Sequence, residues 1–166
     1  MGEKMKDIEE KIIDIGHEIF KGYGVDNITA QILSILNFEP NEISMEELAQ
    51  RTGYSLASIS LKIKNIEQFW SIKRIYRPGS RRTYLYMEKN LLDAFAIQIR
   101  NGFETELDIA KTKITPLIEE YRESASTQEQ KTKLHTYENY LSEINKFEEL
   151  IRYIYYQIDY LKKNQV

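Results

Sequence analysis

Residues 43–66 read ISMEELAQRTGYSLASISLKIKNI and carry the signals of two short helices joined by a glycine turn. Ser44 can cap the first helix, because its hydroxyl can accept from the backbone N–H of Glu47 while the Glu47 side chain reaches back to the Ser44 N–H. Gly53 ends that helix, and Ser55 can cap the second one. The second helix has its apolar residues on one face, at Ile59, Ile63 and Ile66. This spacing predicts a helix-turn-helix with that face turned inward.

A basic hairpin is predicted directly after the two helices. Residues 71–76 and 83–87 are rich in β-branched and aromatic residues, and the segment between them, RPGSRR at 77–82, is a turn sequence. Residues 70–89 hold six Lys or Arg against one Glu, a local charge of +5, in a chain whose net charge is −3. The rest of the chain therefore carries −8, and the positive charge is concentrated in one short stretch.

Helix, glycine turn, helix and basic hairpin follow one another in the order of a winged helix-turn-helix. In that arrangement one helix enters the major groove of DNA and the hairpin tip reaches the backbone or the minor groove. We expect the second helix to present Ser55, Leu56, Ala57, Ser58, Ser60, Leu61, Lys62 and Lys64 to DNA. The expected wing contacts are Lys73, Arg74, Arg77, Gly79, Ser80, Arg81 and Arg82. Arginine suits both phosphate and a narrow minor groove, so Arg77, Arg81 and Arg82 are the predicted anchors.

The flanking segments predict further helices. Ile8, Ile12, Ile15 and Ile19 recur at steps of four, three and four, which indicates an amphipathic helix from about Met5 to Phe20. A second helix is expected from about Ile28 to Pro40. After the hairpin, apolar residues at steps of three and four predict two long helices, about 92–121 and 134–161. Ser126, with Glu129 three residues on, is the expected cap of the last helix.

The predicted fold is mainly α (α+β): a winged helix-turn-helix domain followed by two long helices. The expected divisions are residues 1–25, an N-terminal helix, 26–89, the DNA-binding domain, and 90–166, a helical dimerisation region. The long helices expose more apolar length than the head can cover, so we expect a homodimer. Its interface is predicted at Ile8, Ile12, Ile15, Leu134, Leu141, Ile144, Ile151, Ile154 and Ile158.

Three segments, ISMEELA at 43–49, GYSLASIS at 53–60 and RPGSRRTY at 77–84, resemble the GbsR/MarR group of winged helix-turn-helix regulators. The resemblance covers about residues 28–92. It implies a homodimer built on the terminal helices that binds a partly palindromic operator and represses transcription, and some relatives are tied to osmoprotectant uptake or synthesis. The family usually has a Gly at the end of the recognition helix and an apolar residue next. This chain has Trp70 and Ser71 there.

Several classes of protein are disfavoured by missing residue types. The chain has no Cys, which excludes disulfides and thiolate metal sites. Its histidines, His17 and His135, do not have metal-binding spacing, and no phosphate-cradling or nucleophile motif occurs. We therefore expect no enzyme activity, cofactor or metal. No signal-peptide pattern or run of about 18 apolar residues is present, so the expected location is the cytoplasm, without a membrane partner.

Two other functions stay open beside a sequence-specific regulator of double-stranded DNA. A protein that coats DNA without sequence preference needs phosphate contacts alone. A winged helix can also serve as a protein-interaction adaptor. A small-molecule effector is a further possibility, because several of the 12 Tyr gather on the last helix, where they fit either an aromatic cage or, as we favour, an interface between subunits.

Overall fold

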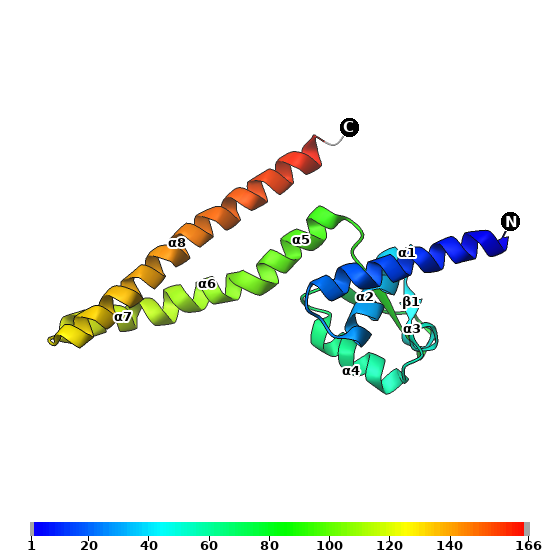
Figure 1. The fold of residues 1–166 in the computed structure, drawn as a ribbon, viewed down its shortest axis with the longest axis horizontal. Helices are drawn as coiled ribbons and strands as arrows, with labels where there is room; N and C mark the ends of the chain where they lie inside the picture. Colours follow the sequence, from blue (N-terminus) through cyan, green and yellow to red (C-terminus); the bar gives the residue numbers. More distant parts are fainter. Residues whose placement is uncertain (1, 165–166) are drawn as a thin grey trace. The chain divides into compact units, whose positions relative to one another are not determined.

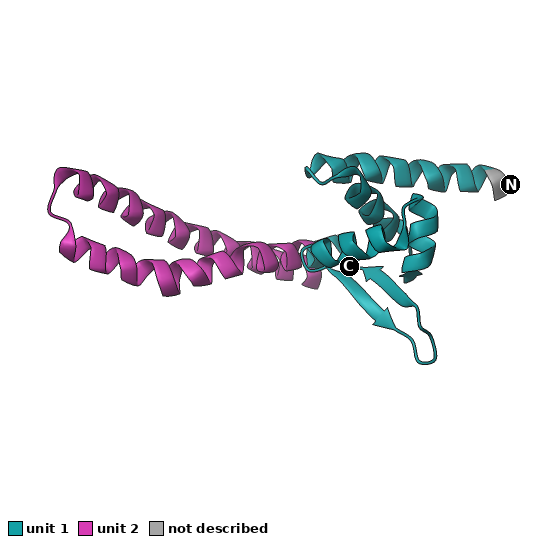
Figure 2. Cartoon of the chain, turned by 90° about the horizontal axis from the view of Figure 1, so that it is seen from below, with its two compact units in different colours: residues 1–94 teal, residues 95–166 magenta. Residues whose placement is uncertain are grey.

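A computed structural model describes residues 2–164 of the chain. The chain divides into two compact units, residues 1–94 and 95–166, drawn in teal and magenta in Figure 2. The helices of the first unit are α1 (Gly2–Gly22), α2 (Asn27–Phe38), α3 (Met45–Thr52) and α4 (Leu56–Ile66), and its strands are β1 (Ile43–Ser44), β2 (Ile72–Tyr76) and β3 (Thr83–Met87) (Figure 1).

The described strands form one antiparallel sheet with the order β1-β3-β2. The hairpin of β2 and β3 pairs from Ile72 with Met87 to Tyr76 with Thr83, which confirms the predicted wing. It projects from the first unit in Figure 2. β1 pairs Ser44 with Tyr84 on the other side of β3 and was not predicted, because two residues are too few to show a strand pattern.

The core of the first unit lies around α2, whose Ile32 and Leu33 are fully buried. Ile59 and Ile63 of α4 are also fully buried, and Ile66 is packed against the same cluster. Leu85 of β3 is buried in the same cluster, so the sheet packs against this core. The predicted inward face of the recognition helix is therefore confirmed, and burying side chains of this size is the dominant stabilising contribution, about 1.5–3 kcal/mol for each.

α1 packs on α2 at a close crossing. Gly16 lies at this crossing, where an added Cβ would lie 2.5 Å from the ring of Phe38. The Ser34 hydroxyl donates to the carbonyl oxygen of Ile13 at 2.5 Å. The face of α1 that carries Gly16 and Phe20 is buried, which leaves the helix's isoleucine stripe on a different, exposed side.

The second unit is a pair of long helical stretches. The first runs through α5 (Leu91–Ile99, which begins in the first unit), η1 (Arg100–Glu104), α6 (Thr105–Ile109), η2 (Ala110–Ile114) and α7 (Thr115–Ser124), and the second is α8 (Gln128–Lys163). η1 and η2 are π-helical turns; in η2 the backbone N–H of Thr115 donates to Ala110 five residues earlier. The buried cluster between the two stretches consists of Ile99, Leu107, Ala110, Ile144 and Ile151.

The cap of α8 differs by one residue from the prediction. Thr127, not Ser126, is the N-cap, and Gln130, not Glu129, completes the capping box. The Gln130 side chain accepts from the backbone N–H groups of both Ser126 and Thr127, each at 2.9 Å. Gln serves at this position as well as Glu does, so both registers were compatible with the sequence.

The predicted class is confirmed: the chain is a mainly helical winged helix-turn-helix protein with a long C-terminal helical pair. Among the described residues, no helix is both long enough and apolar enough to cross a membrane.

Candidate nucleic-acid interface

The recognition helix α4 is held by local signals at its start and by the core along its length. Gly53 ends α3 in the left-handed region at φ 73°, as the turn requires. The Ser55 hydroxyl then accepts from the backbone N–H of Ser58 at 3.2 Å and caps α4. Ser44 caps α3 in the same way, with Glu47 as the donor at 3.1 Å. These caps fix where α4 begins and which of its faces is turned outward.

The outward face of α4 is apolar at its centre. Leu61, two residues from each of the buried Ile59 and Ile63, is 61% exposed, and Leu56 is 46% exposed. Ser55, Ala57 and Lys64 are exposed as well, whereas Ser58, Ser60 and Lys62 are half-buried. The hydroxyls of Ser55 and Ser58 lie 2.9 Å apart, so Ser58 is engaged at the cap. α4 contains no acidic residue, which suits a polyanion.

Lys62 is held by an ion pair. Its Nζ lies 2.5 Å from Oδ2 of Asp26, the residue that caps α2. The Lys62 hydrogen bond, followed by the backbone N–H of Thr29, holds the pKa of the Asp26 carboxyl below its ordinary value. Lys62 is thus directed toward the start of α2 in the free protein.

The tip of the wing is built by a tight turn. Gly79 has φ 77°, and the backbone N–H of Ser80 donates to Arg77 at 3.1 Å. The Ser80 hydroxyl accepts from the backbone N–H of Arg82, also at 3.1 Å. The side chains of Arg81 and Arg82 are exposed and have no partner among the residues that the structure describes. The same is true of Lys64 on α4 and Lys73 on β2.

The arginines on the β2 side of the wing, Arg74 and Arg77, are engaged. Arg74 Nε lies 2.5 Å from Oε2 of Glu67, which follows α4. The Arg77 guanidinium forms an ion pair with Glu42 and lies over the Tyr84 ring, 4.2 Å from its centroid. Hydrogen bonding between the partners lowers the pKa of Glu42 and raises that of Arg77. Nothing in the local sequence indicated these carboxylate partners.

The junction between α4 and β2 shows what Trp70 and Ser71 do. Trp70 is buried and contacts Phe20 and Tyr23 edge-on, with ring centroids 5.5 and 5.4 Å apart. Ser71 adopts φ 56°, the left-handed region that favours glycine. Its hydroxyl is buried and has no hydrogen-bond partner among the described residues. The chain therefore makes a left-handed turn at this junction with a serine in a conformation that favours glycine.

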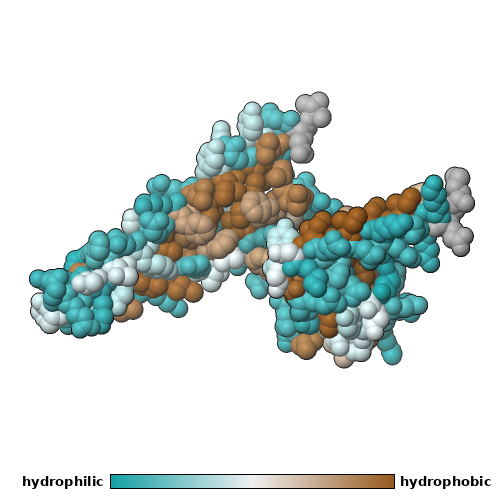
Figure 3. Space-filling model, in the orientation of Figure 1, coloured by the Kyte–Doolittle hydropathy of each residue, from teal (hydrophilic) through white to brown (hydrophobic). Residues whose placement is uncertain are grey.

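The predicted dimer residues fall into three groups. Ile8, Ile12 and Ile15 on α1 are exposed by 41%, 43% and 58% and form, with Met5 and Ile19, a stripe that we call the α1 stripe. It accounts for the brown band along α1 in Figure 3. On α8, Leu134, Leu141 and Ile154 are half-buried. Ile144, Ile151 and Ile158 are buried within the chain itself.

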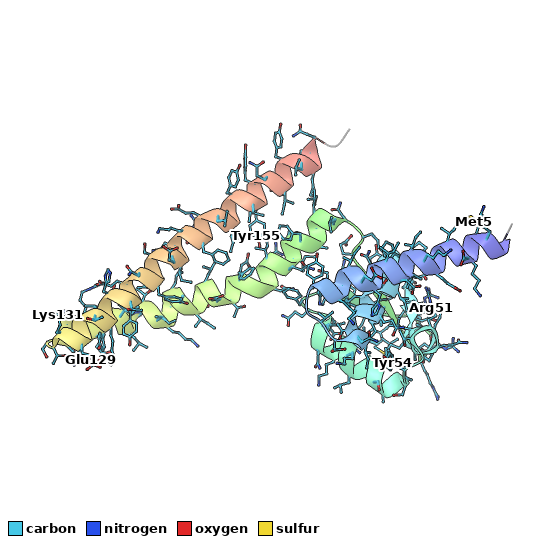
Figure 4. The ribbon with its side chains drawn as sticks, in the orientation of Figure 1. Met5, Arg51, Tyr54, Glu129, Lys131 and Tyr155 are labelled. Atoms are coloured by element: carbon cyan, nitrogen blue, oxygen red, sulfur yellow. The ribbon has the colours of Figure 1, made fainter. Side chains whose placement is uncertain are left out.

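The tyrosines of α8 have separate surroundings. Tyr155, labelled in Figure 4, donates to Glu104 at 3.2 Å, and burial followed by this hydrogen bond raises its pKa. Tyr137 and Tyr140 line an apolar groove of about 380 Å³ at the α7–α8 end of the second unit. Tyr153, Tyr156 and Tyr160 are exposed. These rings do not gather into one cage among the described residues.

The fold and the basic hairpin define this chain as a winged-helix protein, and one solved structure of 20% sequence identity shares the fold. That structure, described as the crystal structure of a transcriptional regulator, has 20% sequence identity to this chain and a TM-score of 0.63. The match covers 94% of this chain and 99% of the other chain. A second solved structure, of the transcriptional regulator PA4135, has 16% sequence identity and a TM-score of 0.39, and the match covers 74% of this chain and 93% of the other chain. No family model and no curated protein matches the sequence.

Proposed function

We propose that this chain is a transcriptional regulator that binds double-stranded DNA as a homodimer, with α4 in the major groove and the wing on the backbone or minor groove. The observation that carries the proposal is the pairing of an acid-free recognition helix with a wing whose tip arginines, Arg81 and Arg82, are unpaired among the described residues. Free guanidinium groups bind phosphate bidentately, and a projecting hairpin can deliver them to a groove.

The finer form of the proposal is a repressor of the GbsR/MarR type that binds a pseudo-palindromic operator. Residues 43–49, 53–60 and 77–84 resemble that group. The solved structure with a TM-score of 0.63 is described as a transcriptional regulator, which supports the broader role in transcription. The α1 stripe supports the homodimer, because five large apolar side chains on one helix are costly to leave in water.

A binding titration tests the proposal. Purified protein is titrated with its own upstream DNA and with a scrambled duplex of equal length, at two salt concentrations. We expect the upstream DNA to bind about a thousandfold more tightly. Arg81→Ala with Arg82→Ala should weaken binding to every duplex and flatten the salt dependence.

A matched control separates the effect of the wing arginines on DNA binding from the effect of a lower net charge. Lys113→Ala with Lys131→Ala removes two exposed positive charges from the second unit, and Lys131 lies near the α7–α8 turn (Figure 4). This variant should bind like the wild type. Equal losses in the two double variants would contradict a specific role for the wing.

The apolar centre of α4 favours a second candidate, a protein that coats DNA without sequence preference. Leu56, Ala57 and Leu61 offer no hydrogen bond to a base edge, and phosphate contacts by the wing alone would suffice for coating. Equal affinity for the upstream and scrambled duplexes, with a steep salt dependence, would favour this candidate. Failure to bind either duplex at low salt would point instead to a protein-interaction adaptor.

A further inference from the structure

Arg77 reaches across the sheet from the end of β2 that enters the turn. It follows β2 directly, its guanidinium lies over the ring of Tyr84 in the middle strand β3, and it ends in an ion pair with Glu42, the residue before β1. The strand order β1-β3-β2 places Tyr84 between the other two, where it pairs with Ser44 and Ile75. A single side chain thus connects the outer strand of the wing to the strand that precedes α3.

We propose that Arg77 is a positioning residue that sets the angle of the wing through Glu42 and Tyr84, and that the DNA contacts are made by the tip arginines. This inference rests on the proposed function and assigns different roles to arginines that the sequence alone placed in one group. Arg77 and Glu42 form the pair that we call the wing clamp.

The position of the wing clamp lets it brace the tip of the hairpin. Arg77 stands at the end of β2 that enters the turn, two residues before Gly79, whereas Glu42 precedes β1. A five-residue strand is roughly 17 Å long, so a change of about 10° in the angle of the hairpin moves the tip by roughly 3 Å. That displacement is enough to break a hydrogen bond between a tip arginine and a phosphate, because such bonds hold only within a few tenths of an ångström. An ion pair that braces the tip end of β2 can therefore control binding by the tip arginines.

The partners of Arg77 also argue against a phosphate contact. A phosphate would compete with the Glu42 carboxylate, which already binds one guanidinium nitrogen, and would meet the negative charge of that carboxylate close by. Arg81 and Arg82 face no such competition among the described residues. If Glu42 instead acts as a competitor that blocks a DNA contact of Arg77, its removal should strengthen DNA binding. The wing clamp predicts the opposite.

The test compares Glu42→Gln, Arg77→Gln, the double variant, and the exchanged pair Glu42→Arg with Arg77→Glu, on the upstream duplex over a series of salt concentrations. Glu42→Gln keeps every positive charge of the wing. We expect it to weaken binding by about two- to fivefold, the range that an exposed ion pair supports, with an unchanged salt slope. The double variant should bind no more weakly than Arg77→Gln alone.

The exchanged pair gives the sharpest result. It restores an ion pair between the same two positions but places a carboxylate where Arg77 stood, so we expect it to recover most of the affinity that Arg77→Gln loses. Tighter binding by Glu42→Gln, or a salt slope lowered by about 0.9 per protomer in Arg77→Gln, would show that Arg77 contacts phosphate and would overturn the proposal.

A measurement without DNA separates this inference from the proposed function. Hydrogen exchange of the β3 amides in the free protein should be faster in Glu42→Gln than in wild type, while exchange in α2 stays the same. Unchanged exchange in β3 would overturn the wing clamp even where the wild type binds DNA. Faster exchange in a protein that binds no duplex would support the clamp and reject the proposed function.

Discussion

Asp26 and Lys62 lie 2.5 Å apart, so the carboxylate that caps α2 also holds a lysine of the recognition helix. Asp26 Oδ1 accepts from the backbone N–H of Thr29 at 3.0 Å, while Oδ2 binds the Lys62 ammonium. The start of α2 and the middle of α4 are 36 residues apart in sequence, and this residue joins them.

Asp26→Asn should keep the cap and lose the ion pair. The pKa of Asp26 is lowered in the folded protein, so its charge stabilises the fold above the ordinary value of 3.8, and this contribution is lost as the pH falls through the folded pKa. Urea unfolding should therefore show wild type as more stable than Asp26→Asn at pH 7 but equal to it at the acid end. Asp26→Ala also loses the cap and should cost about 1 kcal/mol more. A constant difference between wild type and Asp26→Asn across pH would contradict this account.

Ser71→Gly should stabilise the protein by about 1 kcal/mol. Glycine adopts the φ of 56° without strain, and the substitution removes a buried hydroxyl that lacks a partner among the described residues. Ser71→Ala is the matched control, because it removes the hydroxyl but keeps the strained backbone, and it should give a smaller gain. Urea midpoints measure both. A midpoint for Ser71→Gly below that of wild type would show that the serine has a partner outside the described contacts.

Gly16→Ala should loosen α1 from α2. The added Cβ would lie 2.5 Å from the Phe38 ring and closer still to the Ser34 hydroxyl. Overpacking of this kind costs about 1–3 kcal/mol, which outweighs the gain of roughly 1 kcal/mol in helix propensity. Gly22→Ala is the control, since a Cβ there meets nothing within 4 Å. Limited proteolysis should cleave α1 faster in Gly16→Ala only; equal rates in both variants would argue against a tight crossing.

Leu61→Ala should reduce the contribution of thymine methyl groups to DNA binding. Leu61 is at the centre of the outward face of α4. An apolar side chain there can recognise a base through contact with the methyl group of thymine. Replacing thymine by uracil in the bound duplex should weaken wild-type binding about fourfold for each methyl contacted, the value of one buried CH₂ group. Leu61→Ala should bind the two duplexes alike. An undiminished preference for thymine in the variant would remove Leu61 from the interface.

Ile12→Glu should dissociate the proposed homodimer. The substitution places a charge in the middle of the α1 stripe, where desolvation on association would be costly. Lys6→Gln, on the same helix and also exposed, lowers the net charge by the same one unit and is the control for the change in charge. Sedimentation at several concentrations should show a monomer for Ile12→Glu and a dimer for wild type and Lys6→Gln. A dimer in all three would place the interface elsewhere.

The helix-turn-helix and the wing could be predicted because their signals are local. Ser44 and Ser55 act as caps, Gly53 makes the left-handed turn, and the hairpin strands pair as the alternation of residues suggested. The inward face of α4 followed from the spacing of Ile59 and Ile63. Each of these features depends on residues that are close in sequence.

The parts that could not be predicted depend on contacts between distant residues. Glu42 and Arg77 are 35 residues apart, and no local pattern indicates that a wing arginine already has a partner. On α1, periodicity identified an isoleucine stripe but not which face packs against α2. The packing is decided by Gly16, because only a residue without a side chain allows this crossing. The strand β1 exists only through its pairing with β3.

The two π-helical turns divide the first long helix of the second unit into segments whose orientations are set separately. Each such turn holds one residue more than an α-helical turn, and one residue corresponds to a rotation of about 100° around the helix axis. Ile118, which follows η2, is buried, whereas Leu117 beside it is exposed. A π-helical turn can lose its extra residue and return to α-helical geometry, so loss of one codon within η2 would leave the following side chains of α7 on the same side. Loss of one codon within α7 would instead turn every side chain after it by about 100°, although the helix would stay unbroken. Loss of one codon for residues 125–127 would only shorten a connection. In this helix the number of residues matters as much as their identity.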